Sequence, residues 1–238
     1  MSGRRIFVTG GAGYLGSALL GTLAPGLQSG DLGCLVAADV REVPAASRAP
    51  GVDYVHWDVR TRGLESLLAA RDIDTVVHLA AIVTPDANSN RALEYEVDVG
   101  GTRNVLEACS AGGVRQLVVT SSGAAYGYHA DNPDWLIEDA PLRGNAAFAY
   151  SHHKRLVEEM LAGFRQSRPQ LRQVVLRVGT ILGATTRNQI TALFARRRLL
   201  AIRGCRSPFV FVWDQDVVAI IVRAVQGAPA GIFNVAGD

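Results

Sequence analysis

A tyrosine and a lysine four residues apart, Tyr150 and Lys154, give the clearest sign of chemistry in this sequence. In a helix, side chains at positions i and i+4 lie on the same face, so the phenol and the ammonium can contact one ligand. A phenol in water ionises only at about pH 10, but a cation about 4.5 Å away at an effective dielectric of about 20 favours the phenolate by roughly 4 kcal/mol. The pair therefore predicts an acid/base centre in which Tyr150 exchanges a proton with a hydroxyl group.

Ser122 supplies a third polar group from a different segment. It ends the apolar run Gln116–Ser122, and open α/β sheets bind their ligands in the crevice outside the carboxyl ends of the strands. Its hydroxyl can therefore orient a substrate oxygen toward the phenol. Arg177 ends another strand-like segment beside the same crevice, where substrate binding and neutralisation of a buried carboxylate are equally compatible with the sequence.

Three glycines indicate what this crevice binds. Gly10, Gly13 and Gly16 follow the apolar run Ile6–Thr9 directly, at a G-x-x-G-x-x-G spacing. Because glycine lacks a Cβ, the backbone can turn tightly there and let a pyrophosphate approach the N–H groups at the start of the next helix. The spacing predicts a dinucleotide-binding turn between a strand and a helix.

Asp39 strengthens that prediction. It ends a second apolar run, Leu35–Asp39, at about the separation along the chain expected of a carboxylate that binds a ribose hydroxyl. Such a carboxylate repels a 2′-phosphate and so favours NAD over NADP, whereas the nearby Arg41 acts in the opposite direction.

Short apolar segments alternate with longer amphipathic ones along most of the chain. The predicted strands are Ile6–Thr9, Leu35–Asp39, Val52–Asp58, Thr75–Leu79, Gln116–Ser121 and Val174–Arg177. The predicted helices are Tyr14–Leu23, Leu64–Ala70, Ala92–Ala111 and Tyr150–Phe164. Strands with little polar alternation, separated by helices, indicate a parallel sheet covered on both faces. The predicted fold is therefore α/β, a Rossmann-type doubly wound parallel sheet.

The pattern is looser after Val178. It predicts a helix at Gln189–Leu200, an apolar run at Phe209–Trp213, a helix at Asp216–Gln226 and a final strand followed by a turn. Surface loops are predicted at Ala24–Gly33 and Pro44–Gly51. We expect residues 1–178 to form a dinucleotide-binding domain with the catalytic groups, and residues 179–238 to form a substrate-side segment that completes the sheet and is itself incomplete at its C-terminus.

Composition limits the class of protein. A chain of 238 residues with 48% hydrophobic and 19% charged residues can bury a sizeable core as one domain. A net charge of +2 gives no general attraction to nucleic acid or to a membrane surface. A local basic cluster is more typical of a solvated helix end than of an anion site; it comprises Arg196, Arg197, Arg198, Arg203 and Arg206.

The cysteines and the first residues bear on the cellular compartment. Cys34, Cys109 and Cys205 lie far apart and cannot all pair within one chain, which favours reduced thiols. The first residues enter a predicted strand at once, which leaves no room for a signal peptide, and no apolar stretch approaches membrane-spanning length. We therefore expect a soluble cytoplasmic protein.

Together these motifs resemble those of the extended short-chain dehydrogenase/reductase superfamily, and within it the NAD-dependent epimerase/dehydratase family that includes the nucleotide-sugar epimerases. The resemblance covers nearly the whole chain and implies NAD as cofactor, a sugar or nucleotide-sugar substrate and a homodimer. It implies Ser122, Tyr150 and Lys154 as catalytic residues. The cofactor-binding residues it implies, besides Tyr150 and Lys154, are Gly10, Gly13, Tyr14, Leu15, Gly16, Asp39, Asp58, Val59, Leu79, Ala80 and Ala81. The implied substrate-binding residues are Ser122, Gly123, Arg177 and Thr180.

Some positions depart from the pattern of that family. Asp98 and Thr180 stand where the family commonly has asparagine, so details of substrate binding transfer poorly. Dehydratases of the family place an Asp-Glu pair directly after the catalytic hydroxyl, because elimination of water needs an acid and a base. Those positions are Gly123 and Ala124 here, which disfavours dehydration.

Other conspicuous residues are predicted to be structural. His152 and His153 point about 100° apart on a helix, so solvent-facing or packing roles are favoured over a shared metal ion, and no metal site is expected. Trp135 and Trp213 are predicted to be packing anchors rather than stacking platforms for a base or a sugar.

The predicted reaction is hydride transfer at a secondary hydroxyl. Tyr150 would remove the hydroxyl proton while hydride passes to NAD, Lys154 would hold the nicotinamide ribose, and Ser122 would orient the oxygen. An epimerase returns the hydride to the other face, whereas a dehydrogenase of a free sugar, a sugar acid or another alcohol releases the ketone. A dinucleotide-binding sensor without turnover is a third possibility. The sequence does not decide between these outcomes.

Overall fold

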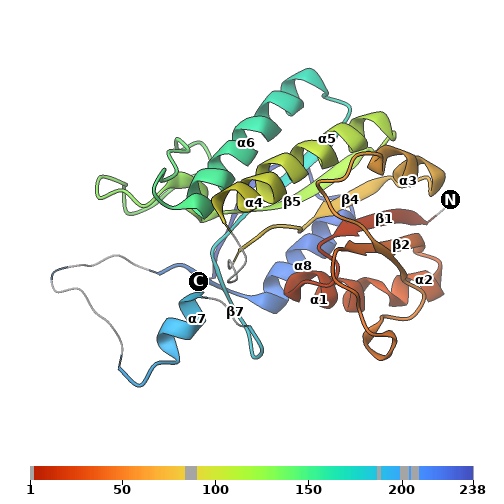
Figure 1. Ribbon diagram of the computed structural model, residues 1–238, viewed down its shortest axis with the longest axis horizontal. Helices are drawn as coiled ribbons and strands as arrows, with labels where there is room; N and C mark the ends of the chain where they lie inside the picture. Colours follow the sequence, from red (N-terminus) through yellow and green to blue (C-terminus); the bar gives the residue numbers. More distant parts are fainter. Residues whose placement is uncertain (1–2, 84–89, 187–188, 199–203, 205–208, 238) are drawn as a thin grey trace.

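A computed structural model of the chain describes residues 3–83, 90–186, 189–198, 204 and 209–237. One parallel sheet runs through the molecule, with helices packed on both of its faces (Figure 1). The prediction of a Rossmann-type doubly wound α/β fold is confirmed. No helix within the described ranges is both long and apolar enough to cross a lipid bilayer.

Within the described residues, the main sheet contains seven parallel strands in the order β3-β2-β1-β4-β5-β6-β9. Their bounds are β1 Arg4–Thr9, β2 Leu32–Asp39, β3 Asp53–His56, β4 Thr75–His78, β5 Gln116–Ser122, β6 Arg172–Val178 and β9 Gly231–Val235. The chain moves outward from β1 to β3 and then returns to the other side of β1 with β4. In folds of this kind, a ligand crevice opens at the carboxyl ends of the strands where their order reverses.

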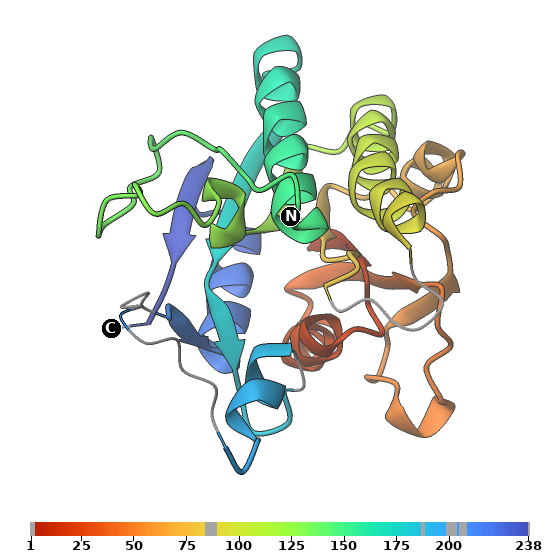
Figure 2. The same ribbon diagram turned by 60° about the vertical axis from the view of Figure 1, so that its left-hand side comes forward.

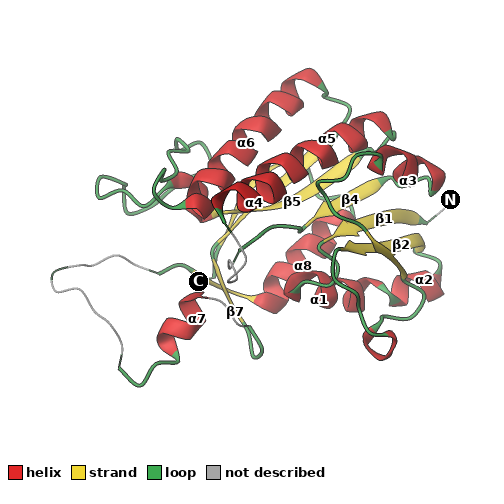
Figure 3. Cartoon of the chain, viewed as in Figure 1, coloured by secondary structure: helices red, strands yellow, loops and turns green. Residues whose placement is uncertain are grey.

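Helices cover the two faces of this sheet (Figure 3). One face carries α3 Leu64–Ala70, α4 Arg91–Tyr95, α5 Gly101–Ala111 and α6 Ala149–Ser167, and the other carries α1 Tyr14–Leu23, α2 Pro25–Ser29 and α8 Asp214–Val225. Phe7 of β1 packs into the core on the α5 side, whereas its neighbours Ile6 and Val8 pack into the core on the α1 side. Successive residues of a strand point to opposite faces, so each central strand contributes to both cores.

The last quarter of the chain completes the sheet and adds a small second one. β9 lies along β6 at the outer edge, on the same side as the segment that follows β5 (Figure 2). A parallel pair is formed by β7, Thr180–Leu182, and β8, Phe211–Trp213, and between them lies α7, Gln189–Phe194. A three-residue strand such as β7 is too short to give a periodic signal in the sequence, and it was not predicted.

Some predictions concern residues that the structure describes only in part. The predicted helix Gln189–Leu200 ends at Phe194, and Leu200 lies outside the described residues. Arg196, Arg197 and Arg198 are exposed, whereas Arg203 and Arg206 also lie outside them. Cys34 and Cys109 are free thiols, the first half-buried and the second buried, and Cys205 is not described.

The predicted surface loop Ala24–Gly33 is wrong in part, because it contains the helix α2. Pro25 occupies the first turn of that helix, and Gly30 ends it in the left-handed region at φ +84°. Proline and glycine mark loops in a sequence, but proline also favours the first turn of a helix and glycine its end. Here these residues frame one extra helical turn instead of a loop.

The predicted helix Ala92–Ala111 forms, but a π-helical turn at Glu96–Gly100 separates α4 from α5. A π turn inserts one extra residue into the helix and frequently occurs at functional sites. As a result, the adjacent residues Asp98 and Val99 are both buried, 4% and 3% exposed. The insertion thereby brings a carboxylate to the inner face of the helix.

His78 joins β4 to strand β1 and to helix α5 through a chain of buried hydrogen bonds. Thr102 Oγ1 donates to the Asp98 carbonyl, so it must accept from His78 Nε2 at 3.0 Å, and His78 Nδ1 then accepts from Thr9 Oγ1 at 2.7 Å. Desolvation, together with the charge of Lys154, lowers the pKa of His78 from 6.5 to about 3. The imidazole is therefore neutral at physiological pH.

This depressed pKa predicts a pH-dependent stability. Below pH 6.5 the unfolded chain binds a proton at His78 that the folded chain does not. The free energy of unfolding therefore decreases as the pH is lowered, by at most about 1.4 kcal/mol per pH unit from this group. His78→Gln should cost about 1–3 kcal/mol at pH 7 through lost hydrogen bonds, but should flatten the decline between pH 6.5 and 5. Urea unfolding at several pH values measures both effects. His56→Gln, at an exposed position, is the control, and equal slopes in wild type and His78→Gln would contradict the assignment.

Candidate active site

The glycine turn after β1 forms a cradle open to an anion. Gly10 has φ +72°, and a Cβ on it would lie 2.8 Å from the backbone nitrogen of Ala80. A Cβ on Gly16 would lie 2.2 Å from the Gly10 carbonyl oxygen. Helix α1 begins at Tyr14 without a side-chain cap and without an acidic residue in its first turn. Its first N–H groups can therefore bind a phosphate, which fits the predicted pyrophosphate site.

Asp39 lies where the ribose ligand was predicted, at the end of β2 beside the glycine turn. Its carboxylate accepts hydrogen bonds from the Ala12 backbone nitrogen at 3.0 Å and from the Arg41 backbone nitrogen at 2.9 Å. The Arg41 guanidinium also contacts it, at 3.2 Å. The carboxylate is thus held against the turn with its charge partly balanced.

The predicted adenine-side pair Asp58 and Val59 follows β3. Arg60 binds the Asp58 carboxylate at 2.6 Å, and this hydrogen bond lowers the pKa of Asp58. Val59 is buried against Gly101 of α5, and Asn104 donates to the Val59 carbonyl at 3.0 Å. These contacts fix the segment at the same edge of the sheet as Asp39.

The predicted cofactor-lining residues Leu79, Ala80 and Ala81 are half-buried and follow β4. The backbone nitrogens of Leu79 and Ala80 donate to Thr9 Oγ1 at 3.2 and 3.3 Å. This pairing places the segment directly beside Gly10, so the residues predicted to bind the dinucleotide lie along one continuous edge.

Ser122, Tyr150 and Lys154 lie at the end of β5 and in the first turns of α6. Lys154 is buried, its Nζ donates to the Thr120 carbonyl at 3.0 Å, and the same atom lies 5.6 Å from the centre of the Tyr150 ring. Ser122 is half-buried, and its Oγ accepts from the Ala124 backbone nitrogen at 3.2 Å. Ser151 Oγ donates to the Ala124 carbonyl at 2.7 Å, which fixes the serine segment to the helix that bears the tyrosine.

Two further aromatic residues lie next to Tyr150 and were not predicted. Phe148 contacts the rings of both Tyr150 and Tyr128, with ring centres 6.1 and 6.0 Å apart. Desolvation and the neighbouring Tyr150 both raise the pKa of Tyr128. Neither residue is part of a motif, so only the structure brings them to this position.

Arg177 neutralises a buried carboxylate, that of Glu158, which is the second of its two predicted roles. It is 4% exposed, and its Nε and Nη2 donate to the Glu158 carboxylate at 2.7–2.9 Å. Its Nη1 donates to Tyr126 Oη and to the Glu138 carbonyl, both at 2.7 Å. Burial opposes the charge, but the bonds to Glu158 raise the pKa of Arg177. All three nitrogens of the guanidinium thus donate to protein atoms.

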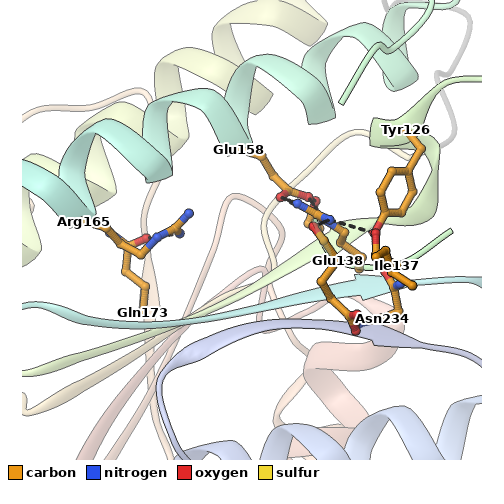
Figure 4. Close-up of polar contacts among 9 residues, drawn as sticks. Tyr126, Ile137, Glu138, Glu158, Arg165, Gln173 and Asn234 are labelled. Carbon is orange, nitrogen blue, oxygen red and sulfur yellow. Dashed lines mark hydrogen bonds and ion pairs between the residues drawn. The ribbon is translucent and has the colours of Figure 1, made fainter. Parts of the chain in front are cut away.

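The same network reaches the outer strand β9 (Figure 4). Asn234 Oδ1 lies 2.7 Å from Tyr126 Oη, and the Asn234 backbone nitrogen donates to Glu138 at 2.7 Å. On the other side of Arg177, Ser121 Oγ donates to Glu158 at 2.5 Å. Buried polar groups thereby tie β5, β6, β9 and α6 together directly behind the candidate active site.

The other predicted residues have mixed outcomes. Gly123 and Thr180 are half-buried, the first directly after Ser122 and the second at the start of β7. Trp135 is 88% exposed and Trp213 47% exposed, and both lie outside the two apolar cores, so the prediction that they are packing anchors is wrong. His152 is half-buried, whereas His153 is buried and bonds Asp98.

Comparison with known proteins agrees with this geometry. A family model described as "NAD dependent epimerase/dehydratase family" matches residues 6–236. The chain belongs to this family. UDP-glucose 4-epimerase from Erwinia amylovora is 32% identical over 193 residues, which are 78% of this chain and 56% of that protein. UDP-glucose 4-epimerase 2 from Oryza sativa subsp. japonica is 33% identical over 189 residues, 76% of this chain and 45% of that protein.

Two solved structures that contain NAD are also similar. UDP-glucose 4-epimerase from Thermus thermophilus, in complex with NAD, superposes with a TM-score of 0.79 at 28% identity, over 98% of this chain and 77% of that one. The Bordetella bronchiseptica enzyme WbmG, in complex with NAD and UDP, has a TM-score of 0.75 at 26% identity, over 99% of this chain and 73% of that one. The present chain spans about half the length of the two curated UDP-glucose 4-epimerases it matches.

The ion pair behind the site predicts a large effect on stability. Arg177→Met leaves the Glu158 carboxylate buried without a cation, so the free energy of unfolding should fall by about 3–5 kcal/mol, and Glu158→Leu in the same chain should restore most of it. Arg71→Met removes a half-exposed pair with Asp53 and should change stability by at most about 1 kcal/mol. Urea unfolding distinguishes these cases; similar losses in Arg177→Met and Arg71→Met would contradict the buried pair.

Proposed function

We propose that this chain forms the NAD-binding and catalytic part of a nucleotide-sugar epimerase that acts at a secondary hydroxyl. The observation that supports this most is that Tyr150 and Lys154 lie one turn apart on α6, where Lys154 Nζ bonds the Thr120 carbonyl of β5, the strand that ends at Ser122. The UDP-glucose 4-epimerases among its relatives support a UDP-sugar as the substrate. Residues 1–178 would bind the cofactor and residues 179–238 would line the substrate side.

The residues present fit NAD. The glycine turn and the uncapped start of α1 would hold the pyrophosphate, Asp39 the adenosine ribose, and the segment of Asp58 and Val59 the adenine. Leu79, Ala80 and Ala81 would line the nicotinamide half. When bound, NAD supplies a hydride acceptor that can also return the hydride.

The protein would supply proton transfer and orientation. Ser122 would orient the reacting oxygen toward the phenol, and Tyr150 would take its proton and later return it. Lys154, fixed by the Thr120 carbonyl, would favour the phenolate and bind the nicotinamide ribose. Gly123 and Ala124 provide no acid and base for elimination, so we favour epimerisation over dehydration.

A homodimer would use the helix face that carries α4, α5 and α6. A groove of about 470 Å³ lies there between helices, lined by Tyr95, Leu156, Met160 and Phe164 among other residues. These apolar side chains, one at the end of α4 and three on α6, provide the surface that a second copy would bury.

Tyr150→Phe is the first test of this mechanism. Removal of the phenolic hydroxyl removes the proton acceptor, so interconversion of UDP-glucose and UDP-galactose with catalytic NAD should slow at least about a hundredfold while NAD affinity stays within about threefold. Tyr54→Phe, on β3, should be unaffected. Turnover that persists unchanged in Tyr150→Phe excludes this role of the phenol, and NADH formed in stoichiometric amount would identify a dehydrogenase instead.

Coenzyme choice tests the role of Asp39. The carboxylate repels a 2′-phosphate while Arg41 attracts one, so the chain should bind NAD at least about tenfold more tightly than NADP. Asp39→Ala removes the repulsion and frees Arg41, and should reduce that preference by about tenfold. Fluorescence titration with both reduced coenzymes measures it; an unaltered ratio would remove Asp39 from the ribose site.

A further inference from the structure

His153 and Asp98 form a buried pair directly beside Lys154 that the proposed chemistry does not use. His153 Nδ1 lies 3.2 Å from Asp98 Oδ2, and the two side chains are 5% and 4% exposed. We propose that this pair is a positioning device that sets the separation between the cofactor-lining segment and the catalytic helix. The inference rests on the proposed function, since it concerns how the same site is held in its active geometry.

Asp98 connects two separate parts of the site. Its Oδ2 faces His153 on α6, and its Oδ1 accepts from the Ile82 backbone nitrogen at 2.9 Å. Ile82 directly follows residues 79–81, which would line the nicotinamide half of the cofactor. One carboxylate, brought inward by the π-helical turn, therefore holds the cofactor-lining segment and α6 at a fixed separation.

In this pair His153 is the hydrogen-bond donor and Asp98 the acceptor. An ionised carboxylate has acceptors only, so the proton between the two side chains resides on His153 Nδ1. A carboxylate can accept from Ile82 and from His153 at once, one bond on each oxygen. The two oxygens of an acid at position 98 thus match the two donors, the Ile82 backbone nitrogen and His153 Nδ1.

The pair also restrains the rotation of α6. His153 is bound on the α5 side, and the next residue, Lys154, is bound to the Thr120 carbonyl of β5. The ring of Tyr95 packs edge-on against His153, with ring centres 5.7 Å apart. Two adjacent residues bound to different elements therefore restrict how α6, and with it Tyr150 one turn earlier, can rotate on the sheet.

Three variants test this inference in the whole chain. His153→Leu removes the donor, and should raise the Kd for NAD about tenfold and lower kcat about tenfold. His153→Asn keeps an N–H near the position of Nδ1, and should restore both values to within about threefold of wild type. The double variant Asp98→Leu/His153→Leu removes the contact between the two side chains and leaves no unpaired buried carboxylate, so we expect the chain to fold. NAD should nevertheless bind to it about tenfold more weakly than to wild type.

Gln116→Leu is the matched control. Gln116 is also buried and donates to the Ala224 carbonyl at 2.7 Å, but at the opposite end of β5, so its loss should lower Tm without any change in the Kd for NAD. Wild-type Kd and kcat in both His153→Leu and the double variant would overturn the inference, whatever their Tm. A wild-type chain that fails to bind NAD would instead contradict the proposed function.

Discussion

The register of β1 against β4 is the constraint on which the rest of this site depends. Thr9 pairs with His78 at the ends of these parallel strands, so the chain must leave both strands at the same place. Gly10 makes this turn possible: its φ is positive, and a side chain at this position would collide with the backbone at Ala80. The close approach of the two segments opens the start of α1 toward the crevice, and the neutral His78 maintains that approach from within the core.

Buried polar contacts, rather than apolar packing alone, determine how α6 lies on the sheet. Three side chains on its inner side reach three different elements: His153 bonds Asp98, Lys154 bonds the end of β5, and Glu158 bonds Arg177 of β6. Apolar contacts tolerate small rotations, whereas hydrogen bonds to buried charges do not. Tyr150, on the first turn of this helix, is therefore held in a well-defined direction, which the proposed proton transfer would require.

Patterns local in sequence predicted most of the fold. The amphipathic segments gave the bounds of α1 and α3 correctly, and the apolar runs located six strands of the main sheet within a few residues. The π-helical turn was not predicted, and the partners of its buried Asp98, Ile82 and His153, come from distant parts of the chain, so no local pattern reveals these contacts. The role of Arg177 was ambiguous for the same reason: its partner Glu158 lies on another element, and only the packed structure brings them together.

The proposed function requires that a dinucleotide lie across the carboxyl ends of the strands with its nicotinamide ribose beside Tyr150 and Lys154. A crystal structure of the chain with NAD and UDP tests it most directly. We expect the pyrophosphate at the first N–H groups of α1 and the nicotinamide ribose hydroxyls within about 3 Å of Tyr150 Oη and Lys154 Nζ. Electron density for the coenzyme elsewhere, or a Tyr150 side chain turned away from the nicotinamide in the complex, would contradict the account.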